Sequence, residues 1–275
     1  TALSLKAYGV EVRLIKVDEN GIVDLKQIEK SIDQNTILVS IMAVNNEIGS
    51  IEPINEIAKI IRHKRKEYAH VYPYFHTDAC QAIYTDINVI KLGIDMMTLD
   101  SHKLYGPRGI GMLYKRRGVN IKPIIHGGNQ EGGIRSGTEN IPGIAGFTYA
   151  MQKAFENKVR DTLHISGLKQ YFSNGLKNIN KDIVFNVDAD KSSPHILSIS
   201  IPNIDNEMFL LRLDAKGISV STKSACLRDE NESYVLKAIG INNSKNVIRF
   251  SFGNNTKKSD LDYVLRVMSS ILKKF

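Results

Sequence analysis

Short apolar runs alternate with amphipathic helical patterns along most of this 275-residue chain, and this alternation limits the possible folds more than any other feature. Strands separated by helices build βαβ units, whose strands lie parallel in one sheet. The clearest early helices are predicted at residues 25–34 and 54–68, with a buried strand between them at residues 36–44. The sequence therefore predicts an α/β fold with a mostly parallel sheet.

A long helical pattern covers residues 140–179 and divides the chain into two parts, with an interruption near Ser166 and Gly167. Beyond it, half-buried strands are predicted at residues 195–201 and 247–252, and helices at residues 207–215, 232–239 and 258–273. We expect a large domain at residues 1–157 and a smaller α+β domain at residues 158–275.

Composition agrees with an ordinary soluble enzyme. No apolar run reaches membrane-spanning length, and the first residues do not have the pattern of a signal peptide. The two cysteines favour a reducing compartment, the cytoplasm or an organelle matrix, over a disulfide framework. The net charge of +8 includes basic clusters at residues 62–66 and 115–117, which fit solvated faces better than a nucleic-acid surface. We therefore expect neither a membrane nor a direct nucleic-acid partner.

The segment at residues 98–111, TLDSHKLYGPRGIG, places Lys103 between strands predicted at residues 94–99 and 109–115. Burial disfavours the charged form of a lysine, so an amine held in such a crevice is free to bond covalently to an aldehyde cofactor. A surface lysine before a Gly-Pro turn is the alternative that this segment alone leaves open.

A second segment, residues 74–81 with the sequence YFHTDACQ, ends another predicted strand and brings His76, Asp78 and Gln81 toward its carboxyl end. Ligands of α/β sheets bind at this edge. An aspartate there can pair with the protonated ring nitrogen of pyridoxal phosphate, and a nearby amide or imidazole can contact the ring. Without further context, such an aspartate is a helix N-cap.

With these segments together, the chain resembles the cysteine desulfurases of the NifS/IscS type, which are class-V aminotransferases and pyridoxal phosphate enzymes of fold type I. Further matching segments are ILVSIMAVNNEIG at residues 37–49, HGGNQEGGIRSGTEN at 126–140, STKSAC at 221–226, ESYVLKAIG at 232–240 and VIRFSFG at 247–253. The resemblance implies a large cofactor domain and a smaller carboxyl-terminal domain. It also implies that Lys103 binds the cofactor and moves the α-proton of the substrate.

Cys226 is implied as the nucleophile that takes the sulfur of L-cysteine as a persulfide and leaves L-alanine. It precedes a polar stretch at residues 227–232, a composition typical of an exposed loop. A lone cysteine is otherwise a small buried hydrophobe, and we expect this for Cys80, where relatives often carry threonine.

The cofactor and substrate residues are also carried over from the resemblance. Arg249 lies in an alternating strand, where its planar fork suits a substrate carboxylate better than packing, with a structural salt bridge as the alternative. The implied cofactor-binding set is Asn46, Asp78, Gln81, Ser101, His102, Lys103 and Thr138, and the implied substrate-binding set is Asn46 and Arg249. Because Thr138 matches a residue that reaches the cofactor phosphate of a second subunit, a homodimer is expected.

Two departures from the family pattern are expected to matter. Asp100 stands where relatives commonly place a serine that binds the phosphate, so either Asp100 turns away and Ser101 takes that role, or cofactor affinity suffers. Relatives also have roughly a hundred residues, the size of a small domain, before the point that matches residue 1. We expect those residues, with their phosphate loop and a ring-stacking histidine, to be missing here.

The resemblance implies a sulfur acceptor, either an iron-sulfur scaffold or a tRNA-thiolation enzyme. One alternative is a selenocysteine lyase or another β-eliminating pyridoxal phosphate enzyme, which would not need Cys226. The other alternative is a non-catalytic fragment or scaffold partner that keeps docking surfaces without a working site.

Overall fold

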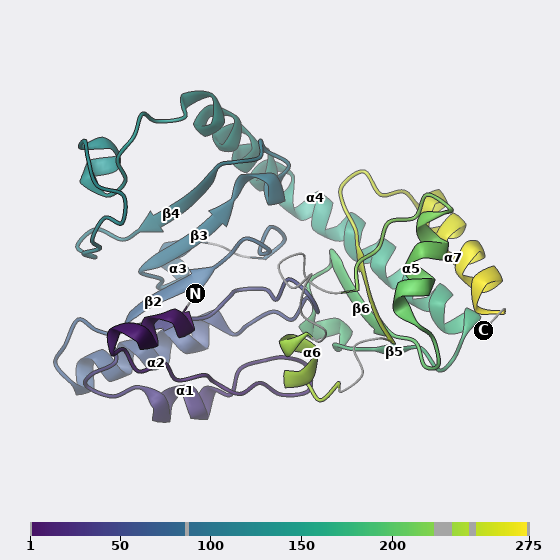
Figure 1. Ribbon diagram of the computed structural model, residues 1–275, viewed down its shortest axis with the longest axis horizontal. Helices are drawn as coiled ribbons and strands as arrows, with labels where there is room; N and C mark the ends of the chain where they lie inside the picture. The colour runs from purple at the N-terminus through teal and green to yellow at the C-terminus, as the bar shows by residue number, and fades with distance from the viewer. Residues whose placement is uncertain (1, 86–87, 223–232, 242–245, 274–275) are drawn as a thin grey trace.

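Two β-sheets, joined by one long helix, form the framework of the computed structural model (Figure 1). The structure describes residues 2–85, 88–222, 233–241 and 246–273. Besides the elements introduced below, the described chain contains the short segments η1 (Ala2–Tyr8), α3 (Val89–Leu92), η3 (Gln130–Gly133) and η4 (Ala189–Lys191). No helix in this part of the chain is long and apolar enough to cross a membrane.

The first sheet has the strand order β1 (Leu38–Ser40), β2 (Tyr74–Asp78), β3 (Met96–Asp100) and β4 (Gly111–Lys115). β1, β2 and β3 are parallel, and β4 is antiparallel to β3, with Met96 opposite Lys115. The expected α/β fold with a mostly parallel sheet is confirmed. The carboxyl ends of three strands therefore meet at one edge of the sheet.

Helices α1 (Leu25–Ser31) and α2 (Ile54–Glu67) pack on this sheet through apolar residues at helical spacing. Ile57, Ala58 and Ile61 of α2 are almost fully buried and share a cluster with Phe75 of β2. The period of 3.6 residues explains why these positions line one face of α2.

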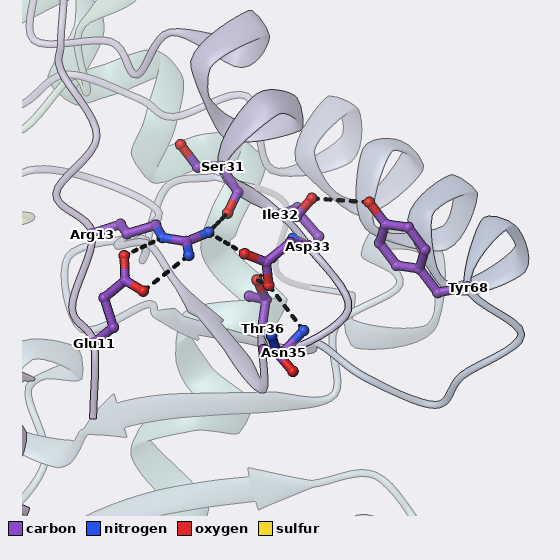
Figure 2. Close-up of polar contacts among 8 residues, drawn as sticks. All are labelled: Glu11, Arg13, Ser31, Ile32, Asp33, Asn35, Thr36 and Tyr68. Atoms are coloured by element: carbon purple, nitrogen blue, oxygen red, sulfur yellow. Dashed lines mark hydrogen bonds and ion pairs between the residues drawn. The ribbon is translucent and has the colours of Figure 1, made fainter. Parts of the chain in front are cut away.

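The end of α1 is tied to the amino-terminal segment by Arg13, as Figure 2 shows. The Arg13 guanidinium lies 2.6 Å from a carboxylate oxygen of Glu11 and 2.6 Å from one of Asp33, and it donates to the carbonyl of Ser31 at 2.7 Å. A cation at a helix carboxyl end also interacts favourably with the helix dipole. This cluster holds the extended segment before α1 against the helix.

Helix α4 (Ile141–Ile179) runs from the first sheet to the second without a break (Figure 1). Phe147 belongs to the apolar cluster of the first sheet, whereas Ile165, Leu168 and Phe172 belong to that of the second. The predicted interruption near residues 166–167 is wrong, because both residues are exposed and buried side chains on either side hold the helix. Since α4 contributes to both clusters, we propose that the domain boundary falls within it, near residue 157.

The second sheet has the order β5 (Val184–Phe185), β6 (Ile196–Ser200) and β7 (Val247–Ser251), all antiparallel. It packs with α4 and with α5 (Asn206–Asp214) and α7 (Lys258–Leu272), and the short α6 (Tyr234–Ala238) precedes β7. β6, β7 and the helices α5, α6 and α7 agree with the prediction to within a few residues, whereas the two-residue β5 was not predicted. The half-buried pattern predicted for β6 is wrong, because four of its five residues are buried.

The second face of β6 is covered by a turn from the first sheet domain. Gly49 in this turn has φ of +82°, and a Cβ added there would lie 2.9 Å from Cβ of Ile196. Its carbonyl accepts the N–H of Ser193 at 2.7 Å, and the N–H of Ile51 donates to the carbonyl of Lys191 at 2.9 Å. A side chain at position 49 would separate the two sheets, so this turn needs a glycine.

Candidate active site

Asp78 ends β2 and is exposed at the edge where the three parallel strands finish. Its Oδ1 accepts the backbone N–H of Cys80 at 2.9 Å, which fixes the turn that leaves the strand. The carboxylate therefore stands at the edge where ligands of α/β sheets bind.

Gln81, three residues further, is oriented by a buried histidine from the second sheet domain. Gln81 Oε1 lies 3.1 Å from Nε2 of His195, and Nδ1 of His195 lies 2.5 Å from the hydroxyl of Ser193. Burial, together with the nearby positive charges of Lys169, Lys103 and Arg249, lowers the pKa of His195 to about 4. The neutral imidazole donates from Nε2 to Gln81 and accepts from Ser193, which leaves the amide N–H groups of Gln81 for another acceptor.

Electrostatic effects also link residues that are distant in sequence. The charges of Lys103 and Arg249 both act on His195, and those of Asp100 and Lys103 act on Cys80, which neighbours Asp78. His195 is the member of this group that the sequence analysis missed. Its signal was a single imidazole at the start of a strand that is otherwise apolar.

Lys103 lies in η2 (Ser101–Leu104), a 3-10 turn between β3 and β4, and its side chain is exposed. The predicted crevice is therefore wrong. In a 3-10 turn the residues at positions one and four share a face. Ser101 and Leu104 point into the core, so His102 and Lys103 point outward.

Asp100 is held by His102, one of the implied phosphate-binding residues, so the expectation that it turns away from the phosphate stays a prediction. Its Oδ1 lies 2.6 Å from Nδ1 of His102 and also accepts the backbone N–H of that residue at 3.3 Å. The negative charge at this unusual position is thus paired with a neighbouring imidazole.

Ser101, however, does not reach toward a ligand. Its side chain is fully buried beside Gly106, and its hydroxyl has no hydrogen-bond partner among the described residues. A phosphate group cannot contact this hydroxyl in the observed arrangement. We therefore correct the expectation that Ser101 replaces the missing serine.

Arg249 in β7 approaches Asn46, so the two residues implied in substrate binding lie together. Nη1 of Arg249 donates to the carbonyl of Asn46 at 2.7 Å, and Nε has no partner in the described part of the chain. Burial lowers the pKa of the guanidinium, whereas the charge of Glu47 raises it. No structural salt bridge to Arg249 is found among the described side chains.

His76 is placed differently from the expectation. It lies within β2, where its ring bridges the neighbouring strands through Ser40 at 2.8 Å and Thr98 at 2.9 Å. It therefore does not converge with Asp78 and Gln81 at the carboxyl end. Its position two residues before the strand end explains this, because the pleat and the register place it between the two adjacent strands.

The remaining candidate residues, Thr138 and Cys226, either form no described hydrogen bond with the residues above or lie outside the described residues. Thr138 is exposed on the segment between η3 and α4, and no hydrogen bond joins it to another candidate within the described residues. Cys226 lies outside the described residues. Cys80 is half-buried, and burial together with the charge of Asp78 raises the pKa of its thiol to about 12, so it is a poor nucleophile.

The donor set fits pyridoxal phosphate. A carboxylate at the ligand edge suits a protonated ring nitrogen, an oriented amide suits a ring oxygen, and a lysine amine suits an aldehyde. His102 and the Lys103 amine, adjacent in η2, suit a phosphate group, and Asp100 is already bonded to His102. Fold and site together define the class of α/β enzymes that use this cofactor.

Comparisons with known proteins place the chain within this class. Residues 1–264 match the family model described as aminotransferase class-V. The chain is 40% identical over 274 residues to "Cysteine desulfurase IscS" of Dictyoglomus turgidum, which covers 98% of this chain and 68% of that protein. It is 39% identical over 283 residues to "Cysteine desulfurase, mitochondrial" of Saccharomyces cerevisiae, covering 99% and 54%. A solved structure named "NIFS-LIKE PROTEIN" superposes with a TM-score of 0.90 at 35% identity, covering 100% of this chain and 71% of that one.

The chain therefore belongs to the class-V aminotransferase family of pyridoxal phosphate enzymes, and its relatives include cysteine desulfurases. It spans about two thirds of the length of the first of these relatives.

Proposed function

We propose that the chain converts L-cysteine to L-alanine and keeps the sulfur as a persulfide on Cys226. The proposal rests on Asp78, Gln81, Lys103 and Arg249. Gln81 contacts His195 of the second domain, Arg249 contacts Asn46 of the first, and the charges of Lys103 and Arg249 both act on His195. A substrate amino acid needs such a set, with one group for the cofactor ring, one amine and one cation for its carboxylate.

Each residue has a distinct part in this proposal. When bound, pyridoxal phosphate supplies the electron sink that stabilises negative charge on the substrate. Asp78 would hold the ring nitrogen in its protonated form, and Gln81, set by neutral His195, would donate to the ring oxygen. Lys103 would hold the cofactor and move the α-proton, and Asn46 would approach the ring or the substrate.

The substrate and the phosphate are assigned to the remaining residues. Arg249 would bind the α-carboxylate through its unused nitrogen atoms. His102 would face the phosphate, and we propose that Thr138 reaches the phosphate of a second subunit in a homodimer. The exposure of Thr138 supports this assignment.

Sulfur transfer needs only a thiolate besides these groups. The sulfur atom of Cys226 would attack the substrate sulfur, so an S–S bond forms and the C–S bond breaks. The electron pair of the broken bond stays on carbon, which takes a proton and becomes the methyl group of alanine. We further propose that the persulfide passes to an iron-sulfur scaffold or a tRNA-thiolation enzyme, in the cytoplasm or an organelle matrix.

The test compares the wild-type chain with Cys226→Ser and Cys80→Ser variants, measuring alanine and protein-bound persulfide from L-cysteine. We expect the Cys226 variant to lose both products and the Cys80 variant to keep them. Turnover that survives in the Cys226 variant would instead identify a lyase that does not use the thiol. No turnover in any chain that binds the cofactor would favour a non-catalytic partner.

A further inference from the structure

Arg249 shares its surroundings with a buried carboxylate that does not pair with it. Glu47 is only 5% exposed, and both side chains line one small cavity between the two domains. The charge of Glu47 acts on Arg249, yet the described side chains show no ion pair between the two within 4.0 Å. A carboxylate and a guanidinium that line the same small cavity have the chemistry to form a bidentate pair.

The Glu47 carboxylate is bonded instead to the hydroxyl of Ser233. Oε2 of Glu47 accepts a hydrogen bond from Oγ of Ser233 at 2.6 Å, and Ser233 is itself 2% exposed. The turn that carries Glu47 is fixed as well, because Oδ1 of Asn45 accepts the N–H groups of Glu47 and Ile48 at 2.8 and 3.0 Å. The carboxylate is thus held by a neutral donor on the start of α6.

The guanidinium of Arg249 therefore keeps N–H groups that Glu47 does not occupy. One nitrogen atom of Arg249 is used by the carbonyl of Asn46, and Nε is buried without a described partner. If Ser233 no longer held Glu47, the Glu47 carboxylate would bind the guanidinium N–H groups of Arg249. A substrate carboxylate needs the same planar donors, so the two carboxylates would compete.

We propose that Ser233 is a positioning residue that holds Glu47 away from Arg249 and so keeps the guanidinium open for the substrate α-carboxylate. The inference rests on the proposed function, which assigns that carboxylate to Arg249. Ser233 acts on substrate binding and touches neither the substrate nor the cofactor.

The first readout separates KM from kcat for L-cysteine in the cofactor-loaded enzyme. We expect Ser233→Ala to raise KM about tenfold, the size of a lost charged hydrogen bond, with kcat within about twofold. Ser233 also caps α6 through the N–H of Leu236 at 3.2 Å, so the double variant Ser233→Ala with Glu47→Gln is essential. Because the double variant has no carboxylate at position 47 to bind the Arg249 guanidinium, its KM should return to near the wild-type value.

The second readout needs no turnover. Calorimetric titration with propionate, which has a carboxylate and no amine, measures how tightly the Arg249 guanidinium binds a carboxylate. Ser233→Ala should weaken propionate binding by the same factor as KM, and the double variant should restore it. Ser200→Ala is the matched control, because it also removes a hydroxyl that donates one hydrogen bond. Ser200 lies in β6 and donates to Oδ1 of Asn186 at 2.7 Å, so its loss should change neither KM nor propionate affinity.

Three results would overturn the inference: an unchanged KM in Ser233→Ala, an increase that persists in the double variant, or a wild-type chain that does not bind propionate. A wild-type chain that binds propionate but does not turn over L-cysteine would count against the proposed function alone. The two failures are therefore distinguishable.

Discussion

The candidate site depends on individual side chains whose roles come from their partners. Asp100 has the wrong charge for a phosphate, but it is paired with His102 at 2.6 Å. Gln81 is polar and half-buried, but His195 fixes its orientation. Each partner acts by satisfying one hydrogen-bonding group and so leaving another available.

His195 gives the first prediction at this scale. His195→Leu keeps most of the volume and removes both ring nitrogen atoms, so Gln81 loses the donor that orients it. We expect the affinity for pyridoxal phosphate, measured by absorbance titration, to fall about tenfold, in line with one lost buried hydrogen bond. His63→Gln, on the exposed face of α2, is the control and should bind the cofactor as the wild type does. An unchanged affinity in His195→Leu would show that Gln81 needs no such partner.

The two cysteines should differ sharply in reactivity. Since burial and Asp78 raise the pKa of the Cys80 thiol to about 12, almost none of it is thiolate at pH 8. Iodoacetamide should therefore label the folded chain at Cys226 and leave Cys80 unmodified, as peptide mass spectrometry can measure. In urea both cysteines should react. Rapid labelling of Cys80 in the folded chain would mean that this pKa argument fails.

At the scale of secondary-structure elements, a single buried carboxylate joins the core of the first sheet domain. Asp95 precedes β3, and its side chain is 2% exposed. Its oxygen atoms accept the N–H of Phe75 in β2 at 2.8 Å and Nε of Arg116 at 2.7 Å, and they also pair with Arg65 of α2. These contacts join a helix, a strand and the end of β4.

Removing this charge should be costly. Because Asp95→Asn leaves two arginines without their buried partner, we expect the free energy of unfolding in urea to fall by about 3–5 kcal/mol. Glu156→Gln, which breaks the exposed pair with Lys153 on α4, is the control and should leave the unfolding midpoint nearly unchanged. A loss in Asp95→Asn no larger than in this control would contradict the account.

The elements also show what the sequence could and could not predict. Periodicity located α2 and α7 almost to the residue, since burial of one face leaves a clear pattern. It failed for the run around β1, which was expected to be buried, because Leu38 in β1 and Ile37 just before it are exposed at the edge of the sheet. An edge position depends on how many strands pair beside it, and local sequence does not contain that information.

The same reasoning applies to the site. The carboxyl-end position of Asp78 follows from one strand and was predictable, whereas the contact between Gln81 and His195 joins residues 114 positions apart. The outward direction of Lys103 depends on the 3-10 geometry of η2, which a short Gly-Pro segment does not specify. Sequence patterns therefore did not predict the contacts between the two domains that complete the candidate site.

At the scale of the whole molecule, the two sheet domains are joined by more than α4. The turn at residues 45–51 packs on the segment before β6, and Glu47, Asn46 and Gln81 of the first domain all contact residues of the second. The site is therefore built across a packed domain interface, and its geometry depends on the stability of the chain as a whole.

Glu52, next to this interface, should make that stability depend on pH. Burial raises its pKa from 4.5 to about 7, so the folded chain holds the proton to a higher pH than the unfolded chain does. Its stabilising contribution is complete below pH 4.5 and is lost as the pH rises through 7.

The measurement is the free energy of unfolding of the wild type and Glu52→Gln between pH 4.5 and 8. The variant does not titrate at this position, so its stability relative to the wild type should rise by about 3 kcal/mol across that range. Glu56→Gln, at a more exposed position of α2, is the control and should show no comparable rise. A constant difference between wild type and Glu52→Gln would contradict the raised pKa.

The central claim is that this chain binds pyridoxal phosphate through Lys103, and the visible absorption spectrum tests it most directly. The purified chain is incubated with pyridoxal phosphate beside Lys103→Ala, with Lys91→Ala on α3 as a control for nonspecific attachment. We expect a new visible band in the wild type and in Lys91→Ala that is absent from Lys103→Ala. A band that is equally strong in Lys103→Ala, or no band in the wild type, would contradict the claim.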